Sequence, residues 1–251
     1  MALLKKLILI LLLLPVFAAA GSYVVFDTDK SVYDQSHNAT EVRSIASITK
    51  LFTATTVLAS GADMSERVKV QGRSGGRFIR GSMVSRLDLF KAMLISSDNL
   101  ASESLAHAHP GGYANFLHSV SKTILAAGLY NTEITDSTGL LASNVSTAAD
   151  LTKFLMYTRQ YPLIAEVSGS RDATVKYQRG KKTYTVQLKN TNPAVHEYSN
   201  ILLSKTGWTT AAGRCVAMLV QHGASTIAVV VLGQRDLRAR TTTVNNLIAS
   251  L

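Results

Sequence analysis

The sequence predicts an α/β (α+β) fold, with an antiparallel sheet of about five strands flanked by helices and a helical insertion. Strand-like runs, in which apolar residues alternate or follow one another, occur near the start of the chain and again near its end. Between these runs, apolar residues recur at helical spacing. Strands at both ends and helices between them indicate one sheet built from the two ends of the chain.

Residues 1–20 have the pattern of a secretory signal peptide. Lys5 and Lys6 form a positive segment, residues 7–17 are apolar, and the alanines at 18–20 fit a small-residue cleavage site. The apolar run is short for a bilayer span. We therefore expect an exported protein that is cleaved near Ala20, with an uncleaved leader that anchors the chain as the alternative.

The segment after the leader predicts a hairpin, from strands at 22–29 and 31–34, and then a buried helix. This helix extends to about Ala59 and ends before Gly61. Residues 72–76 match the Gly-x-Ser-x-Gly nucleophile elbow of α/β-hydrolases, but no helical pattern follows them directly. We interpret them as a flexible glycine-rich turn.

The rest of the chain predicts further helices, a basic hairpin, three strands and a closing helix. The helices are expected at 86–95 after an N-cap at Ser85, at 100–108, at 113–127, and from the capping box 147–150 to about 158. The hairpin is expected at 175–188, the strands at 201–204, 214–221 and 225–232, and the closing helix at 235–251.

Composition and charge narrow the class of protein. The chain has 251 residues, 47% hydrophobic and 17% charged, which suits one large or two small globular domains. Its net charge of +10 falls to +8 without the two leader lysines, and this excess suits nucleic acid, an anionic membrane or an acidic cell wall. Basic residues do not cluster with aromatic ones, so we expect no nucleic-acid partner and a diffuse positive surface.

The single cysteine, Cys215, rules out an internal disulfide and a cysteine-based zinc site. It lies in an apolar run, where a buried and unreactive thiol is expected. No spacing typical of metal ligands is visible among the histidines and acidic residues, so we expect neither a metal nor a cofactor.

Ser47 and Lys50 are the first candidate catalytic residues. Positions i and i+3 of a helix share a face, so Ser47 Oγ and Lys50 Nζ could meet. A hydroxyl is a poor nucleophile until a base takes its proton, and burial can lower the pKa of a lysine enough for that role. A second Ser-x-x-Lys, formed by Ser119 and Lys122, lies within an amphipathic helix, and we expect it to be an exposed face.

The motif Ser97-Asp98-Asn99 could complete the catalytic group. Ser97 is expected in a loop between two helices, where its hydroxyl could relay a proton between Lys50 and a leaving amine. Asn99 offers both donors and acceptors to a substrate peptide bond.

The motif Lys205-Thr206-Gly207 could bind the substrate. Lys205 and Thr206 offer a cation and a hydroxyl to a carboxylate. Gly207 leaves room for a substrate against the backbone. The backbone N–H groups of Trp208 and Ser47 could then form an oxyanion hole.

The three motifs in this order resemble those of low-molecular-mass penicillin-binding proteins of the D-alanyl-D-alanine carboxypeptidase and endopeptidase family. The flanking residues 46–51, 105–113, 137–140, 144–147 and 205–213 resemble the penicillin-binding protein seven branch, which cuts D-alanyl cross-links. The resemblance covers the mature chain. It implies a β-lactamase/DD-peptidase-like fold and a serine DD-peptidase (transpeptidase-like) domain at 21–251.

The resemblance also implies a two-step acyl transfer on peptidoglycan stem peptides in the periplasm. Ser47 would attack the D-alanine carbonyl, with Lys50 as base and Ser97 as relay, and β-lactam inhibitors would acylate the same hydroxyl. We expect a monomer. We also expect at most loose membrane association, because the chain ends after one helix without the C-terminal β-domain and amphipathic anchor of many relatives. The resemblance implies a DD-endopeptidase that cuts D-alanyl cross-links, and/or a DD-carboxypeptidase, and the motifs alone do not decide between the two activities. Asp98 stands where many relatives have Gly or Glu, which should leave the neighbouring roles intact.

Three alternatives remain. A class A β-lactamase needs a carboxylate that activates the deacylating water, and Glu133 and Asp136 are present without the Glu-x-x-Leu-Asn pattern. A non-catalytic peptidoglycan-binding protein could use the same groove. A Ser-His-Asp hydrolase would need one of the six histidines, for which hydrogen bonding at the surface or a helix end is the expected role.

Overall fold

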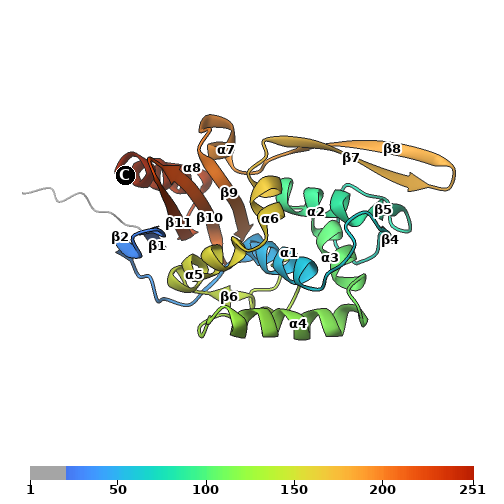
Figure 1. Ribbon diagram of the computed structural model, residues 1–251, viewed down its shortest axis with the longest axis horizontal. Helices are drawn as coiled ribbons and strands as arrows, with labels where there is room; N and C mark the ends of the chain where they lie inside the picture. Colours follow the sequence, from blue (N-terminus) through green and yellow to red (C-terminus); the bar gives the residue numbers. More distant parts are fainter. Residues whose placement is uncertain (1–20) are drawn as a thin grey trace, which may run out of the picture.

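The computed structural model describes residues 21–251 and contains the predicted five-stranded antiparallel sheet (Figure 1). The predicted signal peptide lies outside the described residues. The strand order is β2-β1-β11-β10-β9, so the two ends of the chain share one sheet, as predicted. The strands are β1 (Ser22–Asp27), β2 (Val32–His37), β9 (Ile201–Thr209), β10 (Gly213–His222) and β11 (Ser225–Gln234).

Strand β9 is longer than predicted. The apolar pattern ends at Ser204, but β9 continues through the polar Lys205-Thr206-Gly207 motif to Thr209. Pairing with β10 sustains it, since Lys205 lies opposite Ala217 and Thr209 opposite Gly213. Tertiary pairing therefore extends the strand beyond the part that residue pattern can identify.

The central strands of this sheet are buried on both faces. Alternate residues of β1, β10 and β11 contribute to two separate hydrophobic clusters. One cluster is completed by α8 (Leu237–Ala249) and by α7 (Pro193–Glu197). The other is completed by α1 (Thr49–Ala59) and α5 (Ala148–Thr158), where the rings of Phe52 and Phe154 stack with centroids 3.8 Å apart. The sheet is thus a layer between helices.

The predicted helices are confirmed within about two residues. Beside α1, α5 and α8 they are α2 (Arg86–Ile95), α3 (Asn99–His107) and α4 (Gly112–Ala126). Ser85 and Thr147 cap α2 and α5 as predicted, since their hydroxyls accept hydrogen bonds from the N–H groups of Asp88 and Asp150. The short helices α6 (Pro162–Ser168) and α7 were not predicted, because so few residues show no periodicity.

The predicted basic hairpin belongs to a second sheet, which the sequence did not predict. The hairpin strands are β7 (Asp172–Arg179) and β8 (Lys182–Lys189), and β7 pairs with β5 (Met83–Ser85), which pairs with β4 (Arg67–Lys69). The hairpin projects beyond the helices of the body (Figure 1). A third, minimal sheet joins β3 (Arg43–Ser44) to β6 (Val145–Ser146).

The glycine-rich segment at 72–76 forms neither a strand nor a helix, and its backbone bends at residues 73–74; the flexibility expected of it stays a prediction. The preceding strand β4 ends at Lys69 and the next helix, α2, begins at Arg86, so the strand-turn-helix of a nucleophile elbow is not formed here.

Cys215 is fully buried, and burial raises the pKa of its thiol to about 11, as an inert thiol requires. Between residues 21 and 251, no helix is long and apolar enough to cross a membrane.

Candidate active site

Ser47 and Lys50 meet at the start of α1. Ser47 lies in a 3-10 turn (Ala46–Ile48), and Lys50 lies in the first turn of α1 directly after it. Lys50 Nζ is 2.9 Å from Ser47 Oγ. The lysine side chain is fully buried, whereas Ser47 keeps partial exposure. The predicted nucleophile and base are therefore in direct contact, and the nucleophile is accessible.

The Lys50 ammonium has three acceptors for its three N–H bonds. They are Ser47 Oγ, Asn99 Oδ1 at 2.7 Å and the carbonyl oxygen of Thr138 at 2.6 Å. Burial lowers the pKa of Lys50 to about 7, although the charges of Asp136, Asp98 and Glu103 act in the opposite direction. Near neutral pH, a sizeable fraction of Lys50 is thus an uncharged amine that can accept the Ser47 proton.

Ser97 lies between α2 and α3, as predicted, with a left-handed φ of 56°. Its hydroxyl accepts a hydrogen bond from Lys205 Nζ at 2.9 Å. No hydrogen bond joins Ser97 to Lys50 in the part of the chain that the structure describes. The expected relay therefore has Lys205 as its resting partner, and a proton transfer from Lys50 through Ser97 would need the Ser97 hydroxyl to turn toward Lys50.

The third motif lies on β9 beside the nucleophile. Lys205 is buried, and burial, followed by the charges of Lys50 and Arg240, holds its pKa well below the usual range. No acidic side chain of residues 21–251 forms an ion pair with it. An incoming carboxylate would supply the missing counter-charge and favour the ammonium form.

Close packing against the turn of Ser47 requires a glycine at position 207, in addition to the room that it leaves for substrate. A Cβ at this position would lie 2.9 Å from both the Ser47 nitrogen and the Ile45 oxygen. A side chain would therefore push β9 away from the turn that carries Ser47. The next residue, Trp208, exposes 54% of its surface, and the Arg214 guanidinium lies 4.6 Å from its ring centroid.

Residues 137–140 contributed to the family resemblance, but sequence reasoning missed the contact of their loop, residues 136–141, with Lys50. The carboxylate of Asp136 accepts hydrogen bonds from the N–H groups of Thr138, Gly139 and Leu141 and from the Thr138 hydroxyl. These bonds aim the Thr138 carbonyl at Lys50. Gly139 has a φ of 82° and its Cα lies against the Ala46 carbonyl, where a Cβ would clash. The signal was an Asp followed three residues later by Gly, which is typical of a tight turn.

Asp98 has a structural task that the sequence did not predict. It is the N-cap of α3, because its carboxylate accepts a hydrogen bond from the Ala101 N–H at 2.8 Å. The same carboxylate accepts a hydrogen bond from the Arg77 N–H at 2.6 Å. Asp98 therefore joins the glycine-rich turn to the loop that carries Ser97.

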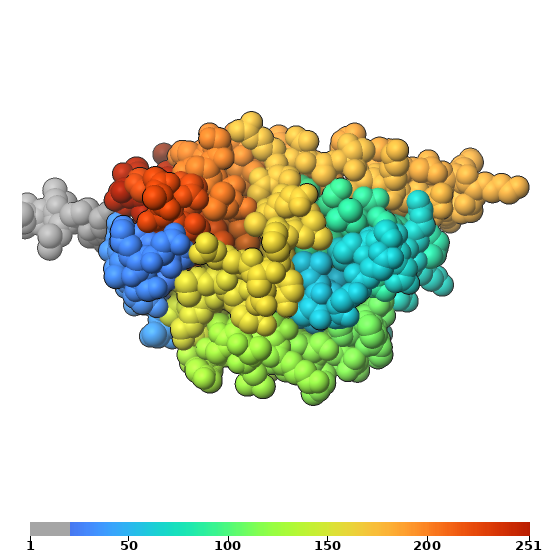
Figure 2. All heavy atoms as spheres, viewed as in Figure 1, coloured from blue at the N-terminus to red at the C-terminus, as the bar shows by residue number. Residues whose placement is uncertain are grey.

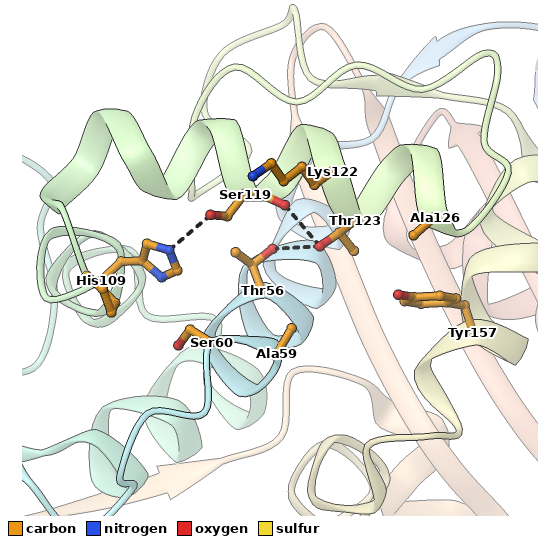
Figure 3. A pocket seen from close by; sticks show the side chains of 10 residues that line it. Thr56, Ala59, Ser60, His109, Ser119, Lys122, Thr123, Ala126 and Tyr157 are labelled. Atoms are coloured by element: carbon orange, nitrogen blue, oxygen red, sulfur yellow. Dashed lines mark hydrogen bonds between the residues drawn. The ribbon is translucent and has the colours of Figure 1, made fainter.

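The second Ser-x-x-Lys does not form a catalytic pair. Lys122 is exposed on α4, and no hydrogen bond joins its amine to Ser119 within residues 21–251; Figure 3 shows the Ser119 hydroxyl directed at His109. Ser119 Oγ instead lies 3.1 Å from His109 Nε2. The buried Nδ1 of His109 has no partner within the described chain, so no carboxylate completes a Ser-His-Asp triad with Ser119 and His109.

The carboxylate of Asp136 should be essential to the fold around Lys50. Replacement of Asp136 by Ala leaves several buried N–H groups without an acceptor, and we expect a loss of about 3 kcal/mol of unfolding free energy. The exposed carboxylate Glu133 is the control, since Glu133→Ala should change stability by less than about 0.5 kcal/mol. Urea denaturation of both variants measures the difference. Equal, small effects would contradict the role given to Asp136.

Comparison with known proteins agrees with this geometry. A family model described as D-alanyl-D-alanine carboxypeptidase, peptidase family S11, matches residues 15–236. The D-alanyl-D-alanine endopeptidase of Escherichia coli is 39% identical over 224 residues, which cover 85% of this chain and 71% of the relative.

Solved structures confirm the predicted DD-peptidase fold. The DD-transpeptidase of Streptomyces K15 superposes with a TM-score of 0.86 at 24% identity, covering 92% of this chain and 96% of its own. Penicillin-binding protein D2 of Listeria monocytogenes, in an ampicillin-bound form, gives a TM-score of 0.82 at 24% identity with the same coverage. The family match and the Escherichia coli relative together show that the chain belongs to the D-alanyl-D-alanine carboxypeptidase family of serine peptidases.

Proposed function

We propose that this protein hydrolyses D-alanyl peptide bonds in peptidoglycan stem peptides, mainly as an endopeptidase that opens cross-links. One observation carries the proposal: the partly exposed Ser47 hydroxyl lies 2.9 Å from a fully buried lysine whose pKa is lowered to about 7. Family membership supports the reaction class. The similarity to the Escherichia coli endopeptidase favours cross-links over terminal D-alanine.

Acylation would begin when the uncharged Lys50 takes the Ser47 proton as Oγ attacks the D-alanine carbonyl carbon. The negative charge that develops on the carbonyl oxygen would be stabilised by the N–H groups of Ser47 and Trp208. As the C–N bond breaks, the Lys50 ammonium returns the proton through the Ser97 hydroxyl to the leaving amine. The products of this step are the Ser47 ester and a free amine.

Deacylation would reverse the proton path. Water attacks the ester carbonyl and gives a proton to Lys50, and Ser47 regains its proton as the C–O bond breaks. Asn99 holds Lys50 through Oδ1, which leaves its amide N–H groups for the substrate peptide. Lys205 and Thr206 would bind the carboxylate beyond the scissile bond.

A β-lactam would acylate Ser47 by the same route and leave slowly. Rapid hydrolysis in a class A β-lactamase depends on a carboxylate that activates water. Here the Asp136 carboxylate is occupied by four donors, and Glu133 is exposed. These placements favour a peptidase over a β-lactamase. A non-catalytic wall-binding protein would not need a buried lysine beside a hydroxyl.

The proposal also includes export after cleavage near Ala20, a single catalytic unit at 21–251, a monomer and no cofactor. Action on the cell wall requires export, and the nucleophile, base and substrate-binding motif come from one chain.

Digestion of purified cross-linked muropeptide dimers tests the activity. The wild-type protein should convert dimers to monomers, and Ser47→Ala should lower the rate by at least about 10³-fold, because the nucleophile is removed. Chromatography of the products measures both. Pentapeptides shortened to tetrapeptides with intact dimers would indicate a carboxypeptidase instead, and no change in either substrate would contradict the proposal.

The pH dependence of acylation tests the base. Lys50 is the acceptor of the proton only when uncharged, and this form grows as pH rises through about 7. The second-order rate constant for labelling with fluorescent penicillin should therefore rise about tenfold per unit below pH 7 and level off above it. Lys50→Arg stays charged and should remain unlabelled at every pH. A wild-type rate that is flat from pH 5 to 9 would contradict Lys50 as the base.

A further inference from the structure

The positive charge of the protein is concentrated in one part of the fold. Residues 66–91 and 171–189 contain 13 lysines and arginines and 3 acidic residues, whereas the other described residues contain 11 basic and 13 acidic ones. Strands β4, β5, β7 and β8 join these two distant segments in one sheet. We call the two segments the basic lobe. The predicted diffuse surface is wrong, because the pairing of β5 with β7 gathers the charge.

Most basic side chains of this lobe lack an acidic partner. Among the exposed ones, Arg77 alone approaches a carboxylate, that of Asp98 at 3.9 Å, as judged over residues 21–251. The ten others have no ion pair within this range: Arg67, Lys69, Arg73, Arg80, Arg171, Lys176, Arg179, Lys181, Lys182 and Lys189. The β7–β8 hairpin projects from the body and carries several of them into solvent (Figure 2). Such a field attracts a polyanion.

The basic lobe is hydrogen-bonded to both chain neighbours of Ser97 in the candidate active site. Its glycine-rich turn is bonded to Asp98, the residue after Ser97, through the Arg77 N–H. The base of its hairpin is bonded to the residue before Ser97, because Lys189 and Ser96 exchange hydrogen bonds of 3.2 and 3.1 Å. A polymer that reaches the candidate active site therefore has the lobe beside it.

We propose that the basic lobe binds the free carboxylates of peptidoglycan stem peptides and holds the enzyme on the sacculus. This inference rests on the proposed function, since it names the polymer that the active site would cut. Stem peptides repeat along the glycan and carry carboxylates at the diamino acid and the terminal D-alanine. Because these carboxylates are separate charges spread along the polymer, a broad array of lysines and arginines suits them better than a single pocket.

The chemistry of the surface favours the wall over a membrane. Membrane-binding elements combine basic residues with an apolar face. The tip of the hairpin, residues 179–183, has the sequence Arg-Gly-Lys-Lys-Thr and contains no apolar side chain. Elsewhere on the lobe, the exposed large hydrophobic side chains are Ile79 and Met83, which expose only 36% and 39% of their surface.

Sedimentation with purified sacculi tests the proposal. All proteins carry Ser47→Ala so that the polymer stays intact. The tip variant adds Arg179→Gln, Lys181→Gln and Lys182→Gln, and a matched control adds Lys122→Gln, Arg235→Gln and Arg238→Gln, which are exposed outside the lobe. Both lower the net charge by three. We expect the tip variant to bind at least about tenfold more weakly than the parent at low salt, and the control to change less than about twofold.

Two further measurements separate carboxylates from other anions. Amidation of the carboxylates of the sacculi should abolish binding of the parent, and 0.5 M NaCl should weaken it strongly, because salt screens exposed charges. Equal binding of tip variant and parent, equal loss in both variants, or unchanged binding to amidated sacculi would each overturn the proposal. Tighter binding to phosphatidylglycerol vesicles than to sacculi would do so as well.

The outcome is independent of the activity test. Because the binding assay uses a protein without its nucleophile, loss of binding in the tip variant reports on the lobe alone. Failure of the wild type to cleave dimers would reject the proposed function. If the tip variant binds sacculi as well as the parent does, the proposed role of the basic lobe is rejected and the proposed function is unaffected.

Discussion

The fully buried amine of Lys50 is the constraint on which the rest of the active site depends. Removal of an ammonium group from water costs several kcal/mol even after the protein relaxes. The structure offsets this cost with three acceptors, and each comes from a different segment: the turn of Ser47, the start of α3 and the loop of residues 136–141. The part of the cost that these acceptors do not offset lowers the pKa of Lys50 to about 7. The same burial therefore positions the lysine and lowers its pKa into the range that the proposed base for Ser47 needs.

Each of these segments is held by contacts that leave little freedom. The turn of Ser47 lies against β9, where only a glycine fits at position 207. The start of α3 is capped by Asp98, which also holds the glycine-rich turn. The loop of residues 136–141 is organised by Asp136, and the Asn144 side chain joins it to the Thr49 hydroxyl on α1. Ala46, beside the site, and Ser97, within it, both have positive φ angles. These strained backbone conformations are maintained by the contacts around them.

The sequence alone predicts the elements and motifs that depend on local chemistry. Ser85 and Thr147 predict the starts of their helices because an N-cap needs a side-chain acceptor, and the i, i+3 spacing places Ser47 and Lys50 on one face. The Thr138 carbonyl could not be predicted, since every residue has a backbone oxygen and only the fold aims this one at Lys50. The extension of β9 and the joining of β5 to β7 were missed for a related reason, because pairing between distant segments leaves no local pattern. The location of the positive charge follows from that pairing.

Peptide mapping of the covalent penicillin adduct tests the assignment of nucleophile and base most directly. The wild-type protein and Ser119→Ala should both carry the adduct on the peptide that contains Ser47, because Ser119 lies beside His109 and has no lysine base. Ser47→Ala should carry none, with its folding verified by an unchanged far-ultraviolet spectrum. An adduct that persists in Ser47→Ala, or that maps to Ser119, would contradict the account.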